Sequence, residues 1–508
     1  MIALLTAVLV AAAPGSLWTP AAPVDPDPPA RSTISPEQHP ERFFFSAVET
    51  GLLIGGGALW YWARVPSGST WDLHFDLKSW KRKADGGAIR FDGDWFDTNA
   101  VGHPMAGIGF FQVARGNGMS FAHAYLWAFV SSLIWEYLVE FKENPSLNDI
   151  IITPAAGAAA GESIFRLGRF FDAGAPTLVN RAGAILLSPF AVLDDLAHRR
   201  RRSSDGPYDL FGFDQSMGHR FVLSLDQLIC VVDGVRSDQT SLAIDTALIS
   251  YRGYRAPGSG WAAVGPGQWS ELSARLLMAG SEGIRGVTFH SGTLLVGRYF
   301  RNYGGGESEI TPELQVPNGW GALLGLSSAF DYMLRDLGWG TDRLASAGLI
   351  GPSAELRTER RGFGAVASLS VHYSFALVES LAYLADGGPP KTVEINTTLR
   401  SEGYYYGHGV TSRGALAMRL GAIELCATAT FAAIWSLNGR DHSQGKLDAD
   451  LSAYDTRSTR AVSAGARPFG GPVVVNARIE HIQRRGSLAG TLASSAETRA
   501  GLGAGLVF

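Results

Sequence analysis

The feature that most constrains the fold of this chain is a two-residue alternation of apolar and polar side chains, which begins near Gly218 and continues to the last residues. Successive side chains of a β-strand point to opposite faces, so this period predicts strands with one apolar and one polar face. Upstream of Gly218 the apolar residues recur at helical spacing or irregularly. The sequence therefore predicts an α+β protein, with a helical domain first and antiparallel strands after it. The clearest strand runs are 221–226, 392–402, 446–454 and 473–483.

The strand runs have the length and spacing of a membrane barrel. About a dozen occur, each near the ~10 residues that cross a bilayer as a tilted strand. The aromatic groups Tyr299-Phe300 and 404–406 resemble the belts found at membrane interfaces. Charged residues make up only 18% of the chain and 62 residues are glycine, which suits a lipid face and closely packed strands. A large soluble β-sandwich or β-propeller is the alternative, and a sandwich would alternate similarly. The expected turns are Asp233-Gly234, Asn438-Gly439 and Gly470-Gly471.

The last ten residues separate these alternatives. Phe508, Leu506 and Leu502 share one face with small apolar residues, while Gly505 and Arg499 lie on the other. This arrangement resembles the terminal strand of outer-membrane barrel proteins, in which the final aromatic residue belongs to the membrane-assembly signal. The resemblance implies outer-membrane lipids and the barrel assembly machinery as partners. We therefore expect residues 218–508 to form an antiparallel transmembrane β-barrel of about 12 strands.

The N-terminus indicates export. Residues 1–13 form an apolar run that ends in small residues and suits a signal peptide. A Pro-rich, disordered tether is predicted over 14–41. The expected location is the outer membrane of a Gram-negative bacterium, with the helical domain on the periplasmic side or, alternatively, plugging the lumen of the barrel. The formal net charge of −4 gives no basis for binding nucleic acid, and the two cysteines, Cys230 and Cys426, are predicted to be packing residues.

The helical domain is expected over 42–215. The segment 43–62 is long and apolar but carries a glutamate and three consecutive glycines, so it predicts a helix buried in protein or lying at a membrane surface. Gly157 and Gly161 stand four residues apart, which lets a neighbouring helix approach closely. Further helices are expected over 121–141, 153–171 and 176–196.

Two stretches of this domain resemble a bacterial family known only as domain of unknown function 3943. They are WFDTNAVGHPMAGIGFFQVARGNGMS at 95–120 and SSLIWEYLVEFKENPSLNDIIITPAAGAAAGE at 131–162. Asp-Thr-Asn, His-Pro, Trp-Glu-Tyr, Asn-Asp and Gly-Glu occur in the family's order. The resemblance implies an envelope protein and supplies no catalytic residue.

Carboxylates in apolar surroundings are the candidate site. Glu136 and Glu140 lie on one helical stripe among large apolar residues, and Glu162 lies in a helix of small residues. Buried carboxylates need partners, and the candidate catalytic residues are His103, Glu136, Glu140 and Glu162. The set could form a packing network, which the sequence favours, or could hold a divalent metal, act as general acid and base, or recognise a head group. A wider polar or ligand network would include Asp97, Asn99, Arg115, Asn148, Asp149 and Arg166.

Asp97-Thr98-Asn99 and Asn148-Asp149 are expected to cap helices. No cofactor is predicted, and an enzyme is not the favoured interpretation. The favoured function is non-enzymatic passage or handling of a lipidic or apolar molecule between the helical domain and the barrel. A small-molecule or lipid ligand would fit it. The alternatives are a lipid-modifying hydrolase or acyltransferase that uses the His/Glu cluster, and a structural or partner-binding envelope protein.

Overall fold

The computed structural model describes residues 40–64, 76–86, 89–198, 208–209, 211–214, 217–251, 254–280, 283–304, 318–387, 399, 402–437, 452–468 and 471–507. The predicted signal peptide, and the tether except for its last two residues, lie outside these ranges. The helical domain comes first in the chain, and four of its helices are extended or joined by short π-helical segments. These segments are η2 (Thr98–Gly102), η3 (Trp135–Val139) and η4 (Gly157–Gly161). The helices are α2 (Phe43–Arg64), α3 (Leu77–Ala84), α4 (His103–Gly116), α5 (Phe121–Ile134), α6 (Leu147–Ala156), α7 (Glu162–Ala173), α8 (Leu178–Leu187) and α9 (Pro189–Ala197).

Antiparallel strands make up the rest of the described chain, with one short helix, α10 (Leu381–Ala385), between two of them. The strands are β1 (Gly218–Val232), β2 (Val235–Ile249), β3 (Gly258–Val264), β4 (Trp269–Ala279), β5 (Gly283–Gly304), β6 (Asn318–Asp336), β7 (Thr341–Arg360), β8 (Phe363–Glu379), β9 (Tyr404–Leu420), β10 (Ile423–Ser436), β11 (Ala453–Ala466), β12 (Val473–Leu488) and β13 (Thr491–Val507). Successive strands pair with one another, except that β2 pairs with β4 and β3 pairs with β5, and the last strand pairs with the first.

The sheet closes into a barrel with twelve wall positions. β3 and β4 both pair with β5 and follow one another in the same direction, so together they fill a single position. Residues 265–268 interrupt this composite strand, and the Gly267 amide donates to Leu294 O at 2.9 Å. The prediction of an antiparallel barrel of about 12 strands after a helical domain is therefore confirmed.

The two faces of the barrel wall differ in polarity. On β12, Val475 and Ile479 are exposed on the outside, while Asn476 and Glu480 line the interior. On β13, Leu502 is likewise exposed on the outer face. An apolar outer face around a polar interior is the arrangement of transmembrane barrels, since a soluble barrel would place its apolar side chains inside.

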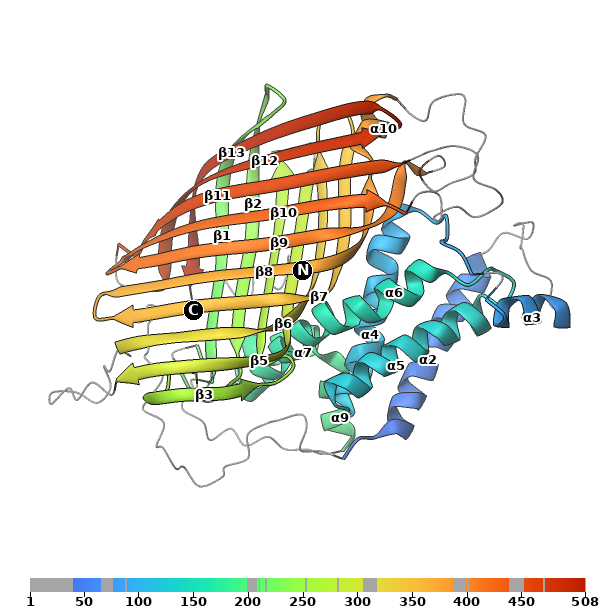
Figure 1. Ribbon diagram of the computed structural model, residues 1–508. Coiled ribbons are helices and arrows are strands. Elements are labelled where there is room, and N and C mark those ends of the chain that lie inside the picture. The colour runs from blue at the N-terminus through green and yellow to red at the C-terminus, as the bar shows by residue number, and fades with distance from the viewer. Residues whose placement is uncertain are drawn as a thin grey trace.

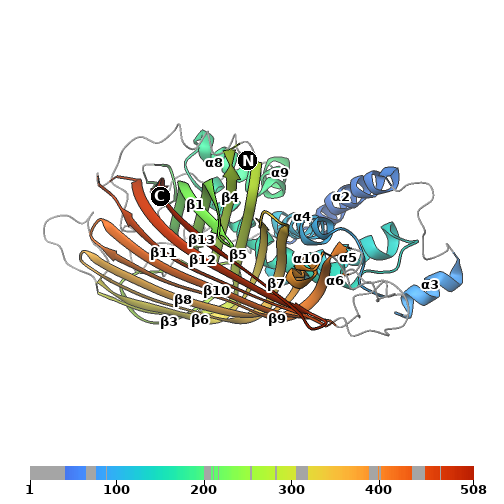
Figure 2. The ribbon, with the colours of Figure 1, turned by 90° about the horizontal axis from the view of Figure 1, so that it is seen from above.

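The described helices of the helical domain pack against the outer wall of the barrel, outside the lumen. Figure 1 shows the helices gathered at one side of the barrel next to β5, β6 and β7, and Figure 2 shows the same arrangement from above. The continuous helix formed by α6, η4 and α7 lies against the wall: Ser291 Oγ donates to Ala159 O at 3.1 Å, and Ser163 Oγ donates to Gly292 O at 3.0 Å. Further along, Phe170 packs on Phe221 of β1.

Close contact between the helices depends on three glycines. A Cβ atom on Gly107 would lie 1.8 Å from Thr153 O, and one on Gly157 would lie 2.8 Å from Gly107 O. A Cβ on Gly161 would lie 3.2 Å from Phe111. The sequence prediction that Gly157 and Gly161 allow a helix to approach is confirmed, and that helix is α4.

Several expectations about local structure need correction or lie outside the description. The helix expected over 176–196 is two helices, because Ser188-Pro189 interrupts it. Most of 392–402 and 446–451 lies outside the described residues, as do Asn438-Gly439 and Phe508. Asp233-Gly234 does form a turn, with positive φ at both residues. By length and composition α2 and the helix at 147–173 could cross a membrane, but the second is 83% buried inside the protein.

The aromatic run at 404–406 is not an interfacial belt, because all three tyrosines are completely buried. Tyr404 and Tyr406 face outward into the helical domain, and Tyr405 faces into the lumen, where its hydroxyl donates to Asp455 at 2.8 Å. Tyr299 is also buried, and only Phe300 joins an outer aromatic cluster, with Trp261 and Trp320.

Candidate functional site

A buried polar cluster lies where the helical domain meets the start of β9. We call Asp92, Asn99, His103, Asn148 and Asp149 the junction cluster. The Asn99 amide donates to Asp92 at 2.8 Å and to the Tyr404 hydroxyl at 3.0 Å, and the Asn148 amide donates to Asn99 at 3.1 Å. The cluster therefore joins three segments of the helical domain to the barrel wall.

Local structure explains why these side chains converge. Ser146 caps α6, with its hydroxyl accepting from the Asp149 amide, and this places Asn148 and Asp149 in the first helical turn. The π-helical turn η2 leads directly into α4, so Asn99 and His103 lie one turn apart. π-helical turns are frequent at functional sites because they redirect side chains from the regular helical spacing.

Three members of the junction cluster could hold a metal ion. One potential ligand atom from each of Asp92, His103 and Asp149 lies within 4.8 Å of those of the other two. His103 Nε2 is 3.4 Å from Asp149 Oδ1. Burial raises the pKa of the Asp149 carboxyl well above its usual value and lowers the pKa of the His103 imidazole. Both shifts favour the neutral forms of these side chains.

Glu136 and Glu140, at the end of α5 and η3, form a second acidic group, and nearby residues already donate hydrogen bonds to both carboxylates. Glu136 accepts from the Ser146 amide at 2.6 Å, and Glu140 accepts from the Trp135 indole at 2.8 Å. Lys83 of α3 donates to the backbone carbonyls of both glutamates. Burial raises the pKa of Glu136 to about 8 and lowers the pKa of Lys83 to about 8.

Glu162 belongs to a third group. Its carboxylate accepts from Arg115 at 2.8 Å and from Arg166 at 2.7 Å, and the Arg166 guanidinium also donates to Pro266 O at 2.8 Å. Pro266 lies in the interruption between β3 and β4. Although burial opposes its charge, the two arginines keep the pKa of Glu162 low. This group fixes the helical domain to a break in the barrel wall.

The structure thus divides the predicted site. Of the candidate catalytic residues, only His103 lies in the junction cluster, while Glu136, Glu140 and Glu162 are enclosed elsewhere. The capping expectation is wrong for Asn99 and Asn148, whose side chains form the buried network. Asp97 makes no side-chain cap bond and instead meets Arg343 of β7 at 3.3 Å.

Sequence reasoning missed Asp92 and Lys83. Asp92 belongs to the run Asp92-Gly93-Asp94, immediately before the family-like segment, and this spacing of two carboxylates was the available signal. Lys83 belongs to a short basic helix that looks like an ordinary solvated surface, and nothing in the sequence marks it as buried.

The barrel interior contains a second set of buried charges, which we call the charged partition. Its arginines and carboxylates come from strands on different sides of the lumen: Arg484 of β12 meets Asp342 of β7 at 3.1 Å. Arg335 meets the same carboxylate at 2.8 Å. The remaining members, each paired within the partition, are Asp455, Glu497 and Arg499.

Beyond the partition the lumen is filled by side chains. An apolar cluster includes Ala382 of α10, Leu399 and Tyr405, together with residues from six strands. The Leu381 amide donates to Asp455 at 3.4 Å, which holds α10 against the partition. In the described part of the chain, the lumen is therefore closed at this end.

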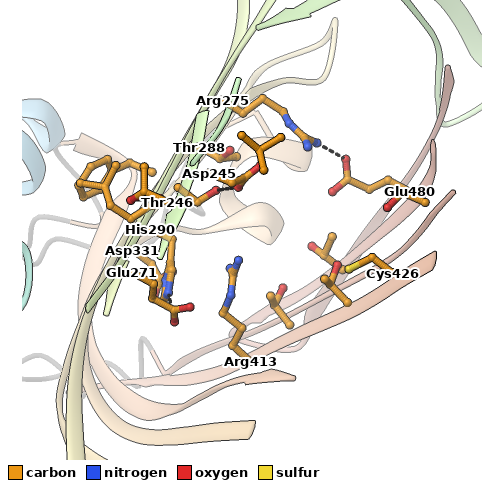
Figure 3. A pocket seen from close by; sticks show the side chains of 18 of the residues that line it. Asp245, Thr246, Glu271, Arg275, Thr288, His290, Asp331, Arg413, Cys426 and Glu480 are labelled. Atoms are coloured by element: carbon orange, nitrogen blue, oxygen red, sulfur yellow. Dashed lines mark hydrogen bonds and ion pairs between the residues drawn. The ribbon is translucent and has the colours of Figure 1, made fainter. Parts of the chain in front are cut away.

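On the other side of the partition lies a polar cavity of about 450 Å³. Its lining reaches Ala422, Arg467 and Val507, at the end of the barrel where β1 begins and β13 ends. Figure 3 shows Glu271, His290 and Asp331 grouped on one wall, with Arg413 pointing into the space beside them. His290 contacts Asp331 at 2.7 Å and Glu271 at 3.0 Å, so this group is internally paired. Arg275 and Glu480 meet across the cavity at 3.1 Å.

Comparison with known proteins agrees with the resemblance found in the sequence. Residues 88–190 match the family model described as Domain of unknown function (DUF3943). This match includes the whole junction cluster and also Glu136 and Glu162, but none of the barrel. No curated protein matches the chain.

Several solved structures resemble the barrel weakly. The NanC porin is 9% identical, covering 55% of this chain and 98% of its own, with a TM-score of 0.23. The translocator domain of the autotransporter NalP from Neisseria meningitidis is 12% identical, covering 63% of this chain and 98% of its own, with a TM-score of 0.19. OmpT, an outer membrane protein of Vibrio cholerae, is 8% identical, covering 58% of this chain and 98% of its own, with a TM-score of 0.21. These TM-scores are too low to support an argument about the fold. The evidence for the barrel is the strand pairing described above, in which β13 pairs with β1.

Proposed function

We propose that this is an outer-membrane protein in which a closed barrel anchors a helical domain beside the bilayer, and that the helical domain handles a lipidic molecule. The observation that carries this proposal is the position of the helices on the outer wall. A barrel wall of this kind faces lipid, so a domain packed on it replaces lipid and borders the surrounding acyl chains.

The surface of the helical domain supports contact with lipid. On α2, Phe44, Leu52 and Leu59 are each more than 70% exposed. Further large apolar side chains are exposed on the neighbouring helices, including Leu126 and Val130 of α5. An exposed apolar surface of this extent marks a membrane or protein interaction site, and here it adjoins the lipid-facing wall of the barrel.

The lumen gives less support to passage of an apolar molecule. Its cavity is lined by charged and hydroxyl-bearing side chains together with apolar ones such as Leu272 and Phe431. The charged partition stands between this cavity and the filled end of the barrel. An apolar solute would lose favourable surroundings on entering such a cavity. The lateral surface is therefore the more suitable place for lipid handling.

We assign the barrel end that contains Gly218 and Val507 to the periplasm. The two longest connections between strands, 380–403 and 437–452, leave from the other end, and long loops of outer-membrane barrels are extracellular. With this orientation the cavity opens toward the periplasm, and the helical domain extends from the periplasmic end along the wall.

The hydrolase or acyltransferase alternative loses its original basis. Its cluster required Glu136, Glu140, Glu162 and His103 to face one accessible cavity, and three of the four are enclosed by separate partners.

Photo-crosslinking in proteoliposomes tests the proposal. A benzoylphenylalanine at Leu52 of α2 should form adducts with phospholipid acyl chains at a yield similar to one at Ile479, which is exposed on the outer wall of β12. The matched control is Lys78, which is exposed on the basic helix α3 and should give few lipid adducts. A yield at Leu52 no higher than at Lys78 would contradict lipid contact by the helical domain.

Solute efflux tests the role of the lumen. Liposomes that contain the protein should release a small polar dye at the rate of protein-free liposomes, because the partition blocks the described lumen. Rapid efflux would show an open channel and would move the proposed function from the helical domain to the lumen.

A further inference from the structure

The junction cluster contains a carboxylate that its surroundings do not satisfy. Asp149 is 1% exposed, and its Oδ2 atom has no hydrogen-bond partner among the described residues. Its other oxygen, Oδ1, accepts from Asn148 Nδ2 at 2.9 Å and lies 3.4 Å from His103 Nε2. A proton on Oδ2 would leave a buried hydroxyl without an acceptor there, so protonation alone does not satisfy this group.

The groups around Asp149 have the composition of a metal site. His103 offers an imidazole nitrogen and Asp92 a second carboxylate, with ligand atoms from the three residues within 4.8 Å of one another. One nitrogen and two carboxylate ligands suit divalent ions such as Zn²⁺ and Mn²⁺, and three protein ligands leave a position for water or another ligand.

Neighbouring side chains hold the three groups in place. Asn99 donates to Asp92 at 2.8 Å, and Asn148 donates to Asp149 at 2.9 Å. Hydrogen bonds of this kind orient the carboxylates that bind metal ions. Tyr404, whose hydroxyl accepts from Asn99, extends this support to the barrel wall.

We propose that Asp92, His103 and Asp149 bind one divalent transition-metal ion at the junction of the helical domain and the barrel. The site differs from the enclosed groups around Glu136 and Glu162, where backbone amides, indole or guanidinium groups already satisfy the carboxylates. It is independent of the proposed lipid handling, since it rests on different residues.

The full-length protein in detergent tests this proposal. After chelation and dialysis, the protein is titrated with ZnCl₂ and, separately, with MnCl₂ in a calorimeter, and bound metal is counted by mass spectrometry. One ion per chain should bind for at least one of the two metals. His103→Ala and Asp149→Asn should each weaken binding by about 10-fold or more, since even supporting partners of metal ligands contribute 10- to 100-fold.

Two matched histidine variants identify the site. His123→Ala removes an exposed imidazole that pairs with Glu41, and His290→Ala removes the lumen imidazole between Glu271 and Asp331. Both should bind metal as the wild type does. Loss of binding in His290→Ala with retention in His103→Ala would place the ion in the lumen and overturn the proposal, as would binding of neither metal by the wild type.

A spectroscopic measurement on the wild type tests the ligands directly, and it does not depend on whether the variants fold. X-ray absorption of the zinc- or manganese-loaded wild type should show one imidazole among otherwise oxygen ligands. Absence of an imidazole from the ligand shell would exclude His103 and contradict the site. Asp92→Asn provides a second carboxylate variant, and heat-modifiable migration of the barrel on gels shows whether each variant is folded.

Discussion

The charged partition of the lumen and the junction cluster of the helical domain are both buried polar groups, but they are balanced differently. In the partition three arginines, Arg335, Arg484 and Arg499, face three carboxylates, and every carboxylate meets at least one guanidinium. In the junction cluster two carboxylates share one histidine, and one carboxylate oxygen has no hydrogen-bond partner among the residues that the structure describes. We infer that buried carboxylates which all meet guanidinium groups mark a structural element, whereas a buried carboxylate oxygen without such a partner marks a place that a ligand could complete.

The largest expected effect on the free energy of unfolding comes from removing one arginine of the charged partition. Arg484→Ala would leave Asp455 buried without its guanidinium partner and Asp342 with Arg335 alone, and removal of one member of a buried pair costs about 3–5 kcal/mol. Urea unfolding of the reconstituted protein, followed by tryptophan fluorescence, measures the change in the free energy of unfolding. The control is Arg236→Ala, because the Arg236–Asp238 pair is exposed at a hairpin. An equal, small effect of both variants would show that the partition does not stabilise the barrel.

The next largest effect tests the helix packing that supports the junction cluster. In Gly107→Ala the new methyl group would lie 1.8 Å from Thr153 O, so α4 and α6 would have to separate. Overpacking of this kind costs about 1–3 kcal/mol, and hydrogen exchange of α4 and α6 should rise. Gly109→Ala meets no atom within 4 Å and should stabilise α4 by up to about 1 kcal/mol. Similar destabilisation by both variants would contradict the close approach.

A smaller effect, which depends on pH, tests the enclosed acidic group near the junction cluster. Burial raises the pKa of Glu136 from about 4.5 to about 8. Between these values the unfolded chain loses the proton while the folded protein keeps it, so the wild type loses stability as the pH rises through this window. Glu136→Gln does not titrate.

The stability of Glu136→Gln relative to wild type should therefore rise between pH 5 and pH 8, by on the order of 2 kcal/mol. Thermal unfolding of both proteins at three pH values measures this difference. A difference that stays constant with pH would mean that Glu136 is charged in the folded protein.

The smallest effect concerns the contact that joins the helical domain to the wall. Tyr404→Phe removes a hydroxyl that donates to Asp94 O at 2.6 Å and accepts from Asn99. The loss should be about 1–2 kcal/mol, since buried partners are left unsatisfied. Tyr373→Phe, at an exposed outer position of β8, should change stability little. If the two variants are equivalent, the hydroxyl of Tyr404 does not hold the domain to the barrel.

The barrel could be predicted from sequence because its signal is local. The alternation of Val475, Asn476 and their neighbours depends only on the two-residue period of a strand, and both faces lie as that period requires. The interior pairing could not be predicted in the same way. Arg484 and Asp342 are 142 positions apart and meet only because the barrel closes.

The position of the helical domain was also beyond sequence analysis. The period assigns Tyr404 and Tyr406 to the outer face but does not reveal whether lipid or protein covers them. The sequence also does not show which buried carboxylates lie near one another, so sequence reasoning groups Glu136, Glu140 and Glu162 with His103 as one candidate site. Glu136 and Glu162 separate from His103 only after Lys83, Arg115 and Arg166 are placed in space.

The central claim is that the helical domain borders lipid beside the barrel, and a spin label at Leu52 of α2 tests it most directly. In proteoliposomes, relaxation by oxygen and by a water-soluble nickel chelate reports whether the label lies in lipid or in water. We expect a preference for oxygen at Leu52 close to that at Ile479 on the outer wall, and the opposite preference at Lys78 of α3. A label at Leu52 that relaxes as the Lys78 label does would contradict the account.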